Sequence, residues 1–262
     1  MERLKEWASS NVTTVTEGTP ISECGSIMYE NCIRHLPVVD AEGRVTGLLT
    51  DFEIFLRGWM AGRMWVPHDD ADQWLLAKEL ARVPDVICFV DDTLLHVLER
   101  LGDTMQDAAL IVDDGRPVGI LTEHDVVRMA ARYLTIDDGG PDHSPSPTSV
   151  SRHEPAVAAR GLMSARRMRH LMVVDGEKLH GVLSFRDVAV ESQLEGVRCE
   201  DVMRFGPIRH VVGSTTFWEA ASIMAKHKVG CVPVVDEEWR PAQMITRSDL
   251  LRAMIDVLRA MA

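Results

Sequence analysis

One pattern of residues occurs four times along this 262-residue chain, and it constrains the fold more than any other feature of the sequence. Each copy has an apolar run ending in aspartate, a turn, a second apolar run, and then a hydroxyl residue three positions before a carboxylate. These hydroxyl and carboxylate pairs are Thr50 with Glu53, Thr122 with Asp125, Ser184 with Asp187, and Thr246 with Asp249. A pattern that recurs at intervals along a chain indicates a fold that repeats one supersecondary unit. We therefore expect four copies of one small unit.

The residues within each copy predict the same order of strands and helices. The β-branched run 232–235 is typical of a buried strand, and the acidic and glycine-containing turn 40–43 reverses the chain between two such runs. Ahead of the first hairpin, Ile21, Cys24 and Met28 recur at helical spacing, and a further short strand is expected before that helix. The unit is therefore an α/β (α+β) arrangement of strand, helix, strand, strand and helix, written βαββα. Because so small a unit cannot cover both faces of its sheet, we expect the copies to pack in pairs.

A change in composition predicts where the pairs separate. Residues 136–149 are rich in proline, glycine, serine and aspartate, which is typical of a flexible or extended linker. The chain is therefore expected to form two modules, residues 1–135 and 150–262, with two paired copies in each. The expected copies span about 8–60 and 80–135 in the first module, and about 148–195 and 198–262 in the second.

The first two copies are separated by an insertion of about ten residues relative to the other copies. This segment, residues 58–74, contains Trp59, Trp65 and Trp74. It is interpreted either as an extra packing helix or as an aromatic patch for dimerisation or for a partner protein.

Composition excludes several classes of function. A formal net charge of −12 and the absence of a dense lysine and arginine stripe disfavour nucleic acid as a partner. A single phosphate group is a different case, since two or three local cations and a helix N-terminus can bind it. No apolar stretch reaches the roughly 18 to 20 residues that cross a bilayer, and the N-terminal residues lack the apolar core of a signal peptide. We therefore expect a cytoplasmic protein without membrane contact.

The cysteines suggest neither a disulfide framework nor a metal site. The five are Cys24, Cys32, Cys88, Cys199 and Cys231. They are scattered without a Cys-x-x-Cys pair, and no cluster of histidine, cysteine and aspartate has the spacing of metal ligands. We expect buried thiols and no bound metal.

The hydroxyl and carboxylate pairs have a purely structural interpretation. Thr/Ser-x-x-Glu/Asp before an apolar helix is a capping box, in which the hydroxyl and the carboxylate bond to backbone groups of the first turn. Such a cap contributes about 0.5–2 kcal/mol to the stability of a helix. A helix N-terminus with free N–H groups is also an anion site, so capping and phosphate binding are compatible.

A basic pair alternates between the copies. When the copies are aligned on the strand aspartate, Arg34-His35 coincides with Arg169-His170, whereas the second copy has Asp107 and the fourth has Gly230 at the first of these positions. Arginine would supply a fixed fork for phosphate, and histidine a charge that changes near pH 6 to 7. The alternative is an ordinary solvated turn after the helix.

The Pro-Val-Val-Asp strands and the Gly-apolar-apolar-Thr/Ser-x-x-Asp endings resemble cystathionine β-synthase (CBS) domains over nearly the whole chain. In that family two consecutive copies associate as a Bateman module. The order of four copies is similar to that of the gamma subunit of AMP-activated protein kinase. The resemblance therefore implies four CBS units paired into two Bateman modules.

The resemblance also implies ligands and binding residues. The expected ligands contain adenosine, namely AMP, ADP, ATP or S-adenosylmethionine, bound in clefts between paired copies. The motif hydroxyls, Thr50, Thr122, Ser184 and Thr246, would meet phosphate, and the motif carboxylates, Glu53, Asp125, Asp187 and Asp249, would hold the ribose. Arg34, His35, Arg169 and His170 would lie near the ligand phosphates. Two positions depart from the family pattern, since Glu53 is longer than aspartate and Gln243 replaces the glycine of the other copies.

These observations predict a ligand-sensing regulatory protein that is not an enzyme and requires no cofactor. Ligand binding would be transmitted to an unidentified regulated partner, and the protein is expected to be a homodimer. The alternative is a constitutive oligomerisation or docking module whose clefts stay empty. No motif supports a hydrolase or a transferase, because the sequence contains no nucleophile elbow, Walker loop or dinucleotide fingerprint.

Overall fold

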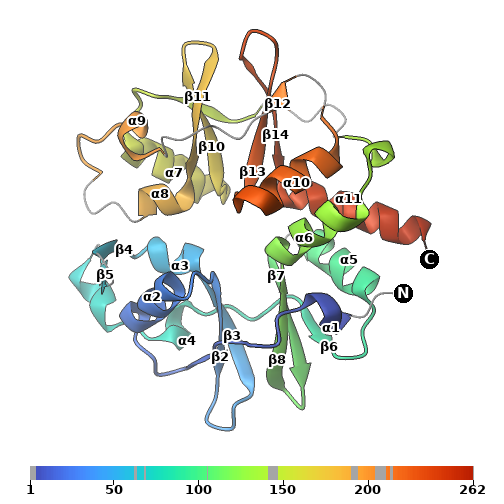
Figure 1. The fold of residues 1–262 in the computed structure, drawn as a ribbon. Coiled ribbons are helices and arrows are strands. Elements are labelled where there is room, and N and C mark those ends of the chain that lie inside the picture. Colours follow the sequence, from blue (N-terminus) through green and yellow to red (C-terminus); the bar gives the residue numbers. More distant parts are fainter. Residues whose placement is uncertain are drawn as a thin grey trace. The chain divides into compact units, whose positions relative to one another are not determined.

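The computed structural model describes residues 4–61, 64–67, 69–104, 106–140, 147–189, 194–203, 211–212 and 215–261 (Figure 1). Within these residues the strands form four three-stranded sheets and one two-stranded hairpin. In each three-stranded sheet a short first strand runs parallel to the central strand, and the third strand pairs antiparallel with the central one. The predicted βαββα unit is thus confirmed in all four copies.

The four copies have closely matching elements. The first comprises β1 (Val15–Thr16), α2 (Ile21–Glu30), β2 (His35–Val39), β3 (Val45–Thr50) and α3 (Asp51–Phe55). The second comprises β6 (Ile87–Phe89), α5 (Leu94–Thr104), β7 (Ala108–Asp113), β8 (Arg116–Thr122) and α6 (Glu123–Tyr133). The third comprises β9 (Ser149–Ser151), α7 (Ala156–Arg166), β10 (His170–Asp175), β11 (Lys178–Ser184) and α8 (Phe185–Ala189). The fourth comprises β12 (Val211–Val212), α10 (Phe217–His227), β13 (Cys231–Val235), β14 (Pro241–Thr246) and α11 (Arg247–Ala260).

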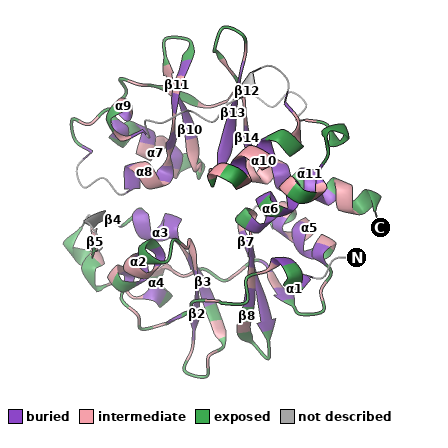
Figure 2. Cartoon of the chain, viewed as in Figure 1, coloured by how far each residue is buried: buried purple, intermediate pink, exposed green. Residues whose placement is uncertain are grey.

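Shorter elements precede the first copy or join the copies. They are α1 (Leu4–Trp7), the hairpin β4 (Gly58–Ala61) and β5 (Met64–Pro67), the 3-10 turns η1 (Asp70–Trp74) and η2 (Ile136–Asp138), and the helices α4 (Ala77–Leu80) and α9 (Cys199–Val202). The apolar stripe predicted for α2 is confirmed, because Ile21, Cys24 and Met28 are all buried. Figure 2 shows the same pattern elsewhere, with buried central strands and helices that are buried along one face.

The structure divides into two compact units with the boundary between Asp125 and Val126. In the first unit, the sheets of the first two copies pack through a cluster of Leu48, Ala108 and Leu110. In the second unit, Met172 and Leu179 of the third copy cluster with Val235 of the fourth. The expected pairing of neighbouring copies is therefore confirmed. The expected linker at 136–149 stays a prediction, and residues 141–146 lie outside the described residues.

Each hairpin contains a register shift at the same position, which the sequence did not predict. The shift follows Val38 in the first copy and Val173 in the third. The residue opposite is Gly47 or Gly181, and an added Cβ would lie 2.7 Å from Ala81 Cβ in the first case and 2.6 Å from Met203 Sδ in the second. Glycine at this position therefore lets the chain segment that leaves the copy cross closely over the third strand.

The two crossing segments are held by matching backbone hydrogen bonds. In the first unit, Ala77 N donates to Thr19 O at 2.8 Å, and Leu48 N donates to Arg82 O at 2.8 Å. In the second unit, Cys199 N donates to Glu154 O at 2.9 Å. We call residues 75–82 and 197–203 the first and second connectors.

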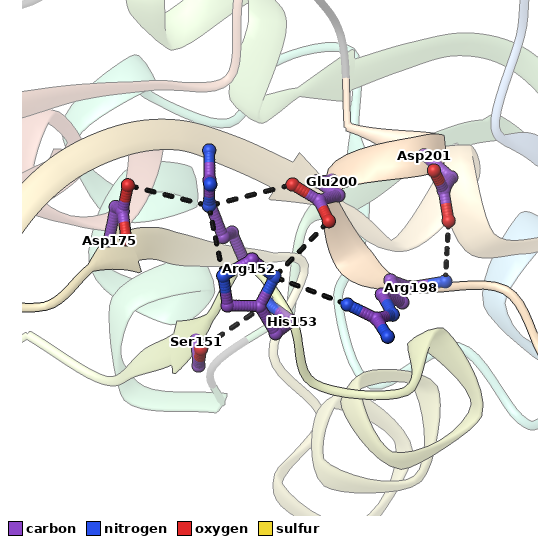
Figure 3. A network of polar contacts seen from close by, with 7 residues as sticks. All are labelled: Ser151, Arg152, His153, Asp175, Arg198, Glu200 and Asp201. Carbon is purple, nitrogen blue, oxygen red and sulfur yellow. Dashed lines mark hydrogen bonds and ion pairs between the residues drawn. The ribbon is translucent and has the colours of Figure 1, made fainter.

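Side chains add a polar network at the second connector (Figure 3). Arg152 Nε lies 3.2 Å from His153 Nε2, 3.4 Å from Asp175 Oδ2 and 3.5 Å from Glu200 Oε2. His153 Nδ1 lies 3.2 Å from Glu200 Oε1. The network joins the end of β9, the end of β10 and α9, so it fixes the second connector to the sheet of the third copy.

The tryptophan-rich insertion is a hairpin, which corrects the expectation of an extra packing helix. Strands β4 and β5 pair with Met60 opposite Trp65, and Trp65 is 3% exposed. An added Cβ on Gly25 of α2 would lie 2.8 Å from Trp65 Cδ1, so this helix glycine makes room for the indole. The helix expectation was wrong because consecutive residues of this segment face opposite sides, with Met64 exposed and Trp65 buried, as in a strand. Trp74 is 77% exposed, and the side chain of Trp59 lies outside the described residues.

Four of the five cysteines are buried as expected. Burial raises the pKa of Cys24 and of Cys231 to about 12, and that of Cys88 and of Cys199 to about 11. Cys32 is exposed, which corrects the prediction for that residue. It lies in the turn after α2 with φ at 55°, whereas the four buried cysteines lie within helices or strands.

Helix α10 supplies a prediction about pH. Hydrogen bonds from Thr216 N and Thr215 Oγ1, each 2.9 Å long, lower the pKa of Glu219. The ionised carboxylate therefore stabilises the fold at neutral pH, and this contribution is lost as pH falls below the ordinary glutamate pKa of about 4.3. We expect Glu219→Gln to unfold at lower urea than the unsubstituted protein at pH 7, with the difference shrinking below about pH 4.

A control with the same change of charge is Glu238→Gln, in the exposed turn before β14. Urea unfolding of each variant at pH 7, 5 and 3.5 measures the effect. A destabilisation by Glu219→Gln that is constant over this range would contradict the role given to the carboxylate.

Candidate functional site

The four motifs cap their own helices. Thr122 donates to Asp125 Oδ2 from its N–H and from its hydroxyl, both at 2.8 Å. Thr246 does the same to Asp249 Oδ2 at 2.8 and 2.7 Å. The third copy has Ser184 N at 3.0 Å from Asp187 Oδ2, together with a bond from the serine hydroxyl. The capping interpretation of these three motifs is confirmed, and their role toward a ligand stays a prediction.

The first copy has a variant of this cap. Thr50 Oγ1 donates to Glu53 Oε2, and Phe52 N donates to Thr50 Oγ1 at 3.3 Å. The longer glutamate therefore still reaches the hydroxyl. Glu53 also forms an ion pair, because Arg82 Nε of the first connector lies 3.1 Å from Glu53 Oε1. The Glu53 side chain is 8% exposed, whereas that of Arg82 is 59% exposed.

The sheet register places each motif beside the start of the central strand. His35 pairs with Thr50 and His170 with Ser184, and the other copies pair the equivalent residues. The first N–H of the motif helix donates to the carbonyl that precedes the strand, as in Asp51 N to Arg34 O at 2.9 Å. The Arg-His pairs that alternate between the copies therefore lie next to the motifs in space.

In the first unit the basic pair is held by carboxylates. His35 Nε2 lies 3.1 Å from Asp107 Oδ1, and the His35 side chain is 8% exposed. Arg34 Nε lies 3.7 Å from Asp51 Oδ2. Asp107 belongs to the second copy, and Glu123 N of the second motif helix donates to its carbonyl at 3.0 Å. His35 of the first copy therefore contacts the residue whose carbonyl accepts from the motif helix of the second copy.

In the second unit a glycine takes the position of Asp107. An added Cβ on Gly230 would lie 2.6 Å from His170 Cε1 and 3.6 Å from a terminal nitrogen of Arg247. His170 of the third copy and Arg247, the first residue of the fourth motif helix, therefore both lie against Gly230. The Nε atoms of Arg186 and Arg247 are buried without a hydrogen-bond acceptor among the described residues, although both side chains make other contacts.

Three residues at these sites were not expected from the sequence as binding partners. Asp107 could have been found, because it has the position in the second copy that Arg34 has in the first. When the two copies pair, these equivalent positions before the central strands, which carry opposite charges, come together. Asp51 directly follows a motif hydroxyl, but nothing in the sequence marks it as a partner of Arg34. Arg82 had no signal, since its contact depends on the path of the first connector.

The described part of the chain contains no group of three or more histidine, cysteine, aspartate or glutamate residues that could hold a metal ion. Among the helices that it includes, none has the length and apolar character needed to cross a membrane.

A family model described as CBS domain matches residues 4–57, 77–132, 143–193 and 199–256. This chain belongs to the CBS domain family. The four matched segments contain the four hydroxyl and carboxylate motifs, so the family resemblance seen in the sequence is confirmed.

Three relatives of this CBS protein span most of its length. An uncharacterised 33.4 kDa protein of Thermofilum pendens is 25% identical, over 86% of this chain and 81% of that protein. Protein MJ1404 of Methanocaldococcus jannaschii is 26% identical over 98% of this chain, which spans 62% of that protein. The solved structure of MJ1225 from the same organism, described as a candidate archaeal homologue of γ-AMPK, superposes with a TM-score of 0.80 at 22% identity. It covers 97% of this chain and 100% of that chain, so the two share one fold.

Proposed function

We propose that this CBS protein is a ligand-sensing regulatory protein, and that its paired repeats bind an adenosine-containing ligand. AMP, ADP, ATP and S-adenosylmethionine are the candidates, and a regulated partner would read the change. One observation carries the proposal: in both units, a histidine from one copy lies against the residue that precedes the central strand of its paired copy, next to the motif of that copy. A hydroxyl, a carboxylate and basic groups are thus gathered where the two copies meet.

The chemistry of these groups suits a nucleotide. A threonine or serine hydroxyl can donate to phosphate, and an ionised carboxylate can accept from ribose hydroxyls. A carboxylate has about four acceptor positions, so it can keep its cap and accept a sugar hydroxyl together. In the fourth copy, one Asp249 oxygen serves the cap and the other lies 3.6 Å from an Arg252 nitrogen. A cytoplasmic location, a homodimer and the absence of catalysis belong to the same proposal.

The alternative function is a constitutive oligomerisation or docking module. It is favoured by the completeness of the caps, since every motif already satisfies its hydroxyl and carboxylate within the protein. In the first unit, Arg34 and His35 are also already paired with carboxylates. A module of this kind would need no ligand.

Thermal unfolding with a panel of AMP, ADP, ATP and S-adenosylmethionine separates the two functions. A ligand present at 100 times its dissociation constant stabilises the folded state by about 2.7 kcal/mol, so the sensor should melt several degrees higher. GMP is the control for recognition of adenine. If no adenosine compound raises the melting temperature or gives heat on titration, the docking module is the better account.

The motif carboxylates give a second test. Asp249→Ala should weaken binding of the stabilising nucleotide by about tenfold or more if the carboxylate holds the ribose. Glu219→Ala is the matched control, because Glu219 caps α10 with the same chemistry outside the four motifs. Each loses about 0.5–2 kcal/mol of capping energy. Equal binding by both variants would show that Asp249 is only a cap.

A further inference from the structure

The two units carry opposite charges at aligned positions around their motifs. The positions are the residue before each central strand and the first two residues of each motif helix. In the first unit their charged residues are one arginine and three carboxylates, Arg34, Asp51, Asp107 and Glu123. In the second unit they are three arginines and no carboxylate, Arg169, Arg186 and Arg247. The motif carboxylates themselves are two in each unit.

From this difference we infer that the second unit binds the phosphate group of an anionic ligand and that the first unit does not. The inference rests on the proposed function and adds to it the class of ligand that each unit accepts. Arg247 and Arg186 are thereby assigned to the phosphate site of the second unit, in addition to Arg169 and His170, which the family pattern already indicated.

The aligned positions are neighbours in space, which makes their charges act together. In the second unit, Phe185 N donates to Arg169 O at 2.8 Å. A terminal nitrogen of Arg247 and the His170 ring both lie against Gly230. Guanidinium groups present planar forks of donors that match phosphate oxygens, and their charge-assisted bonds are stronger than neutral ones.

The first unit has the opposite electrostatics. Asp107 accepts from His35 at the position where the second unit has Gly230. Asp51 neutralises Arg34 at 3.7 Å, and Glu53 neutralises Arg82 at 3.1 Å. A phosphate placed there would meet basic groups that are already paired with carboxylates, in a partly buried site where charges are screened less than in water.

Isothermal titration of the full chain with ADP and with adenosine tests the inference, since the two ligands differ only by the diphosphate. We expect Arg247→Gln and Arg169→Gln each to weaken ADP binding by about tenfold or more, while adenosine binding changes by less than about threefold. Arg44→Gln, in the exposed β2–β3 turn, is the matched control for loss of one positive charge. Circular dichroism and melting temperatures show whether each variant is folded. If one of the two arginine variants does not fold, the other still tests the inference.

The other results are equally informative. If ADP binding survives in both arginine variants but is lost in Arg34→Gln, the phosphate sits in the first unit, and the inference is wrong while the sensor function stands. If ADP and adenosine bind the wild type with equal affinity, no phosphate site exists, which also overturns the inference. If neither compound nor any of the panel binds, the proposed function fails first.

Discussion

Replacing Leu110 by alanine is expected to lower the free energy of unfolding by about 2–5 kcal/mol. Leu110 is 0% exposed and packs with Leu48 and Ala108, where the sheets of the first two copies meet. The substitution removes apolar contacts from both sheets and leaves a cavity that two β-sheets cannot easily collapse to fill. Urea unfolding followed by circular dichroism measures the change.

The control for Leu110→Ala is Val118→Ala on β8, where the valine is 39% exposed. That substitution should cost less than about 1 kcal/mol, because it removes little buried area. Equal losses for the two variants would mean that the paired sheets are not packed through Leu110.

Gly47→Ala is expected to lower the free energy of unfolding by about 1–3 kcal/mol, although alanine is the better residue in most strands and helices. An added Cβ would lie 2.7 Å from Ala81 Cβ and 3.4 Å from the Arg82 carbonyl oxygen, so the first connector must move away from β3. The Leu48 N to Arg82 O hydrogen bond lies at the same place and would lengthen. Urea unfolding measures the loss.

Two further variants make the Gly47 experiment specific. Ala81→Gly in the same chain should restore much of the lost stability, since it removes the atom in conflict. Gly161→Ala on α7 meets nothing within 4 Å and should stabilise the protein by about 0.5–1 kcal/mol. Failure of Ala81→Gly to rescue Gly47→Ala would show that the connector does not set the requirement for glycine.

The repeated fold could be predicted because its signals are local. Apolar runs, turn residues and helical spacing all lie within one copy, and the same signals recur four times. The hairpin at 58–67 could not be predicted in this way, because it depends on a contact between distant parts of the sequence, in which Trp65 packs against Gly25 of α2. The need for glycine at position 47 likewise reflects the first connector, which lies some thirty residues further along the chain.

The site was predictable in part for a related reason. The cap between Thr122 and Asp125 is local, so its residues could be named from the sequence. The contact between His35 and Asp107 joins two copies, and it becomes visible only when the pseudo-symmetry of the pair is known. Ion pairs such as Arg82 with Glu53 depend on where a connector runs, and no spacing rule reports that path.

The caps also bear on the kinetics of recognition. Because the motif hydroxyls and carboxylates are already immobilised at ordered helix ends, an incoming molecule would find them preorganised and would lose little affinity to ordering them. On binding, a motif hydroxyl would donate to the ligand in place of its present acceptor, the motif carboxylate. Differences in affinity among ligands would then arise chiefly from how fast each one leaves.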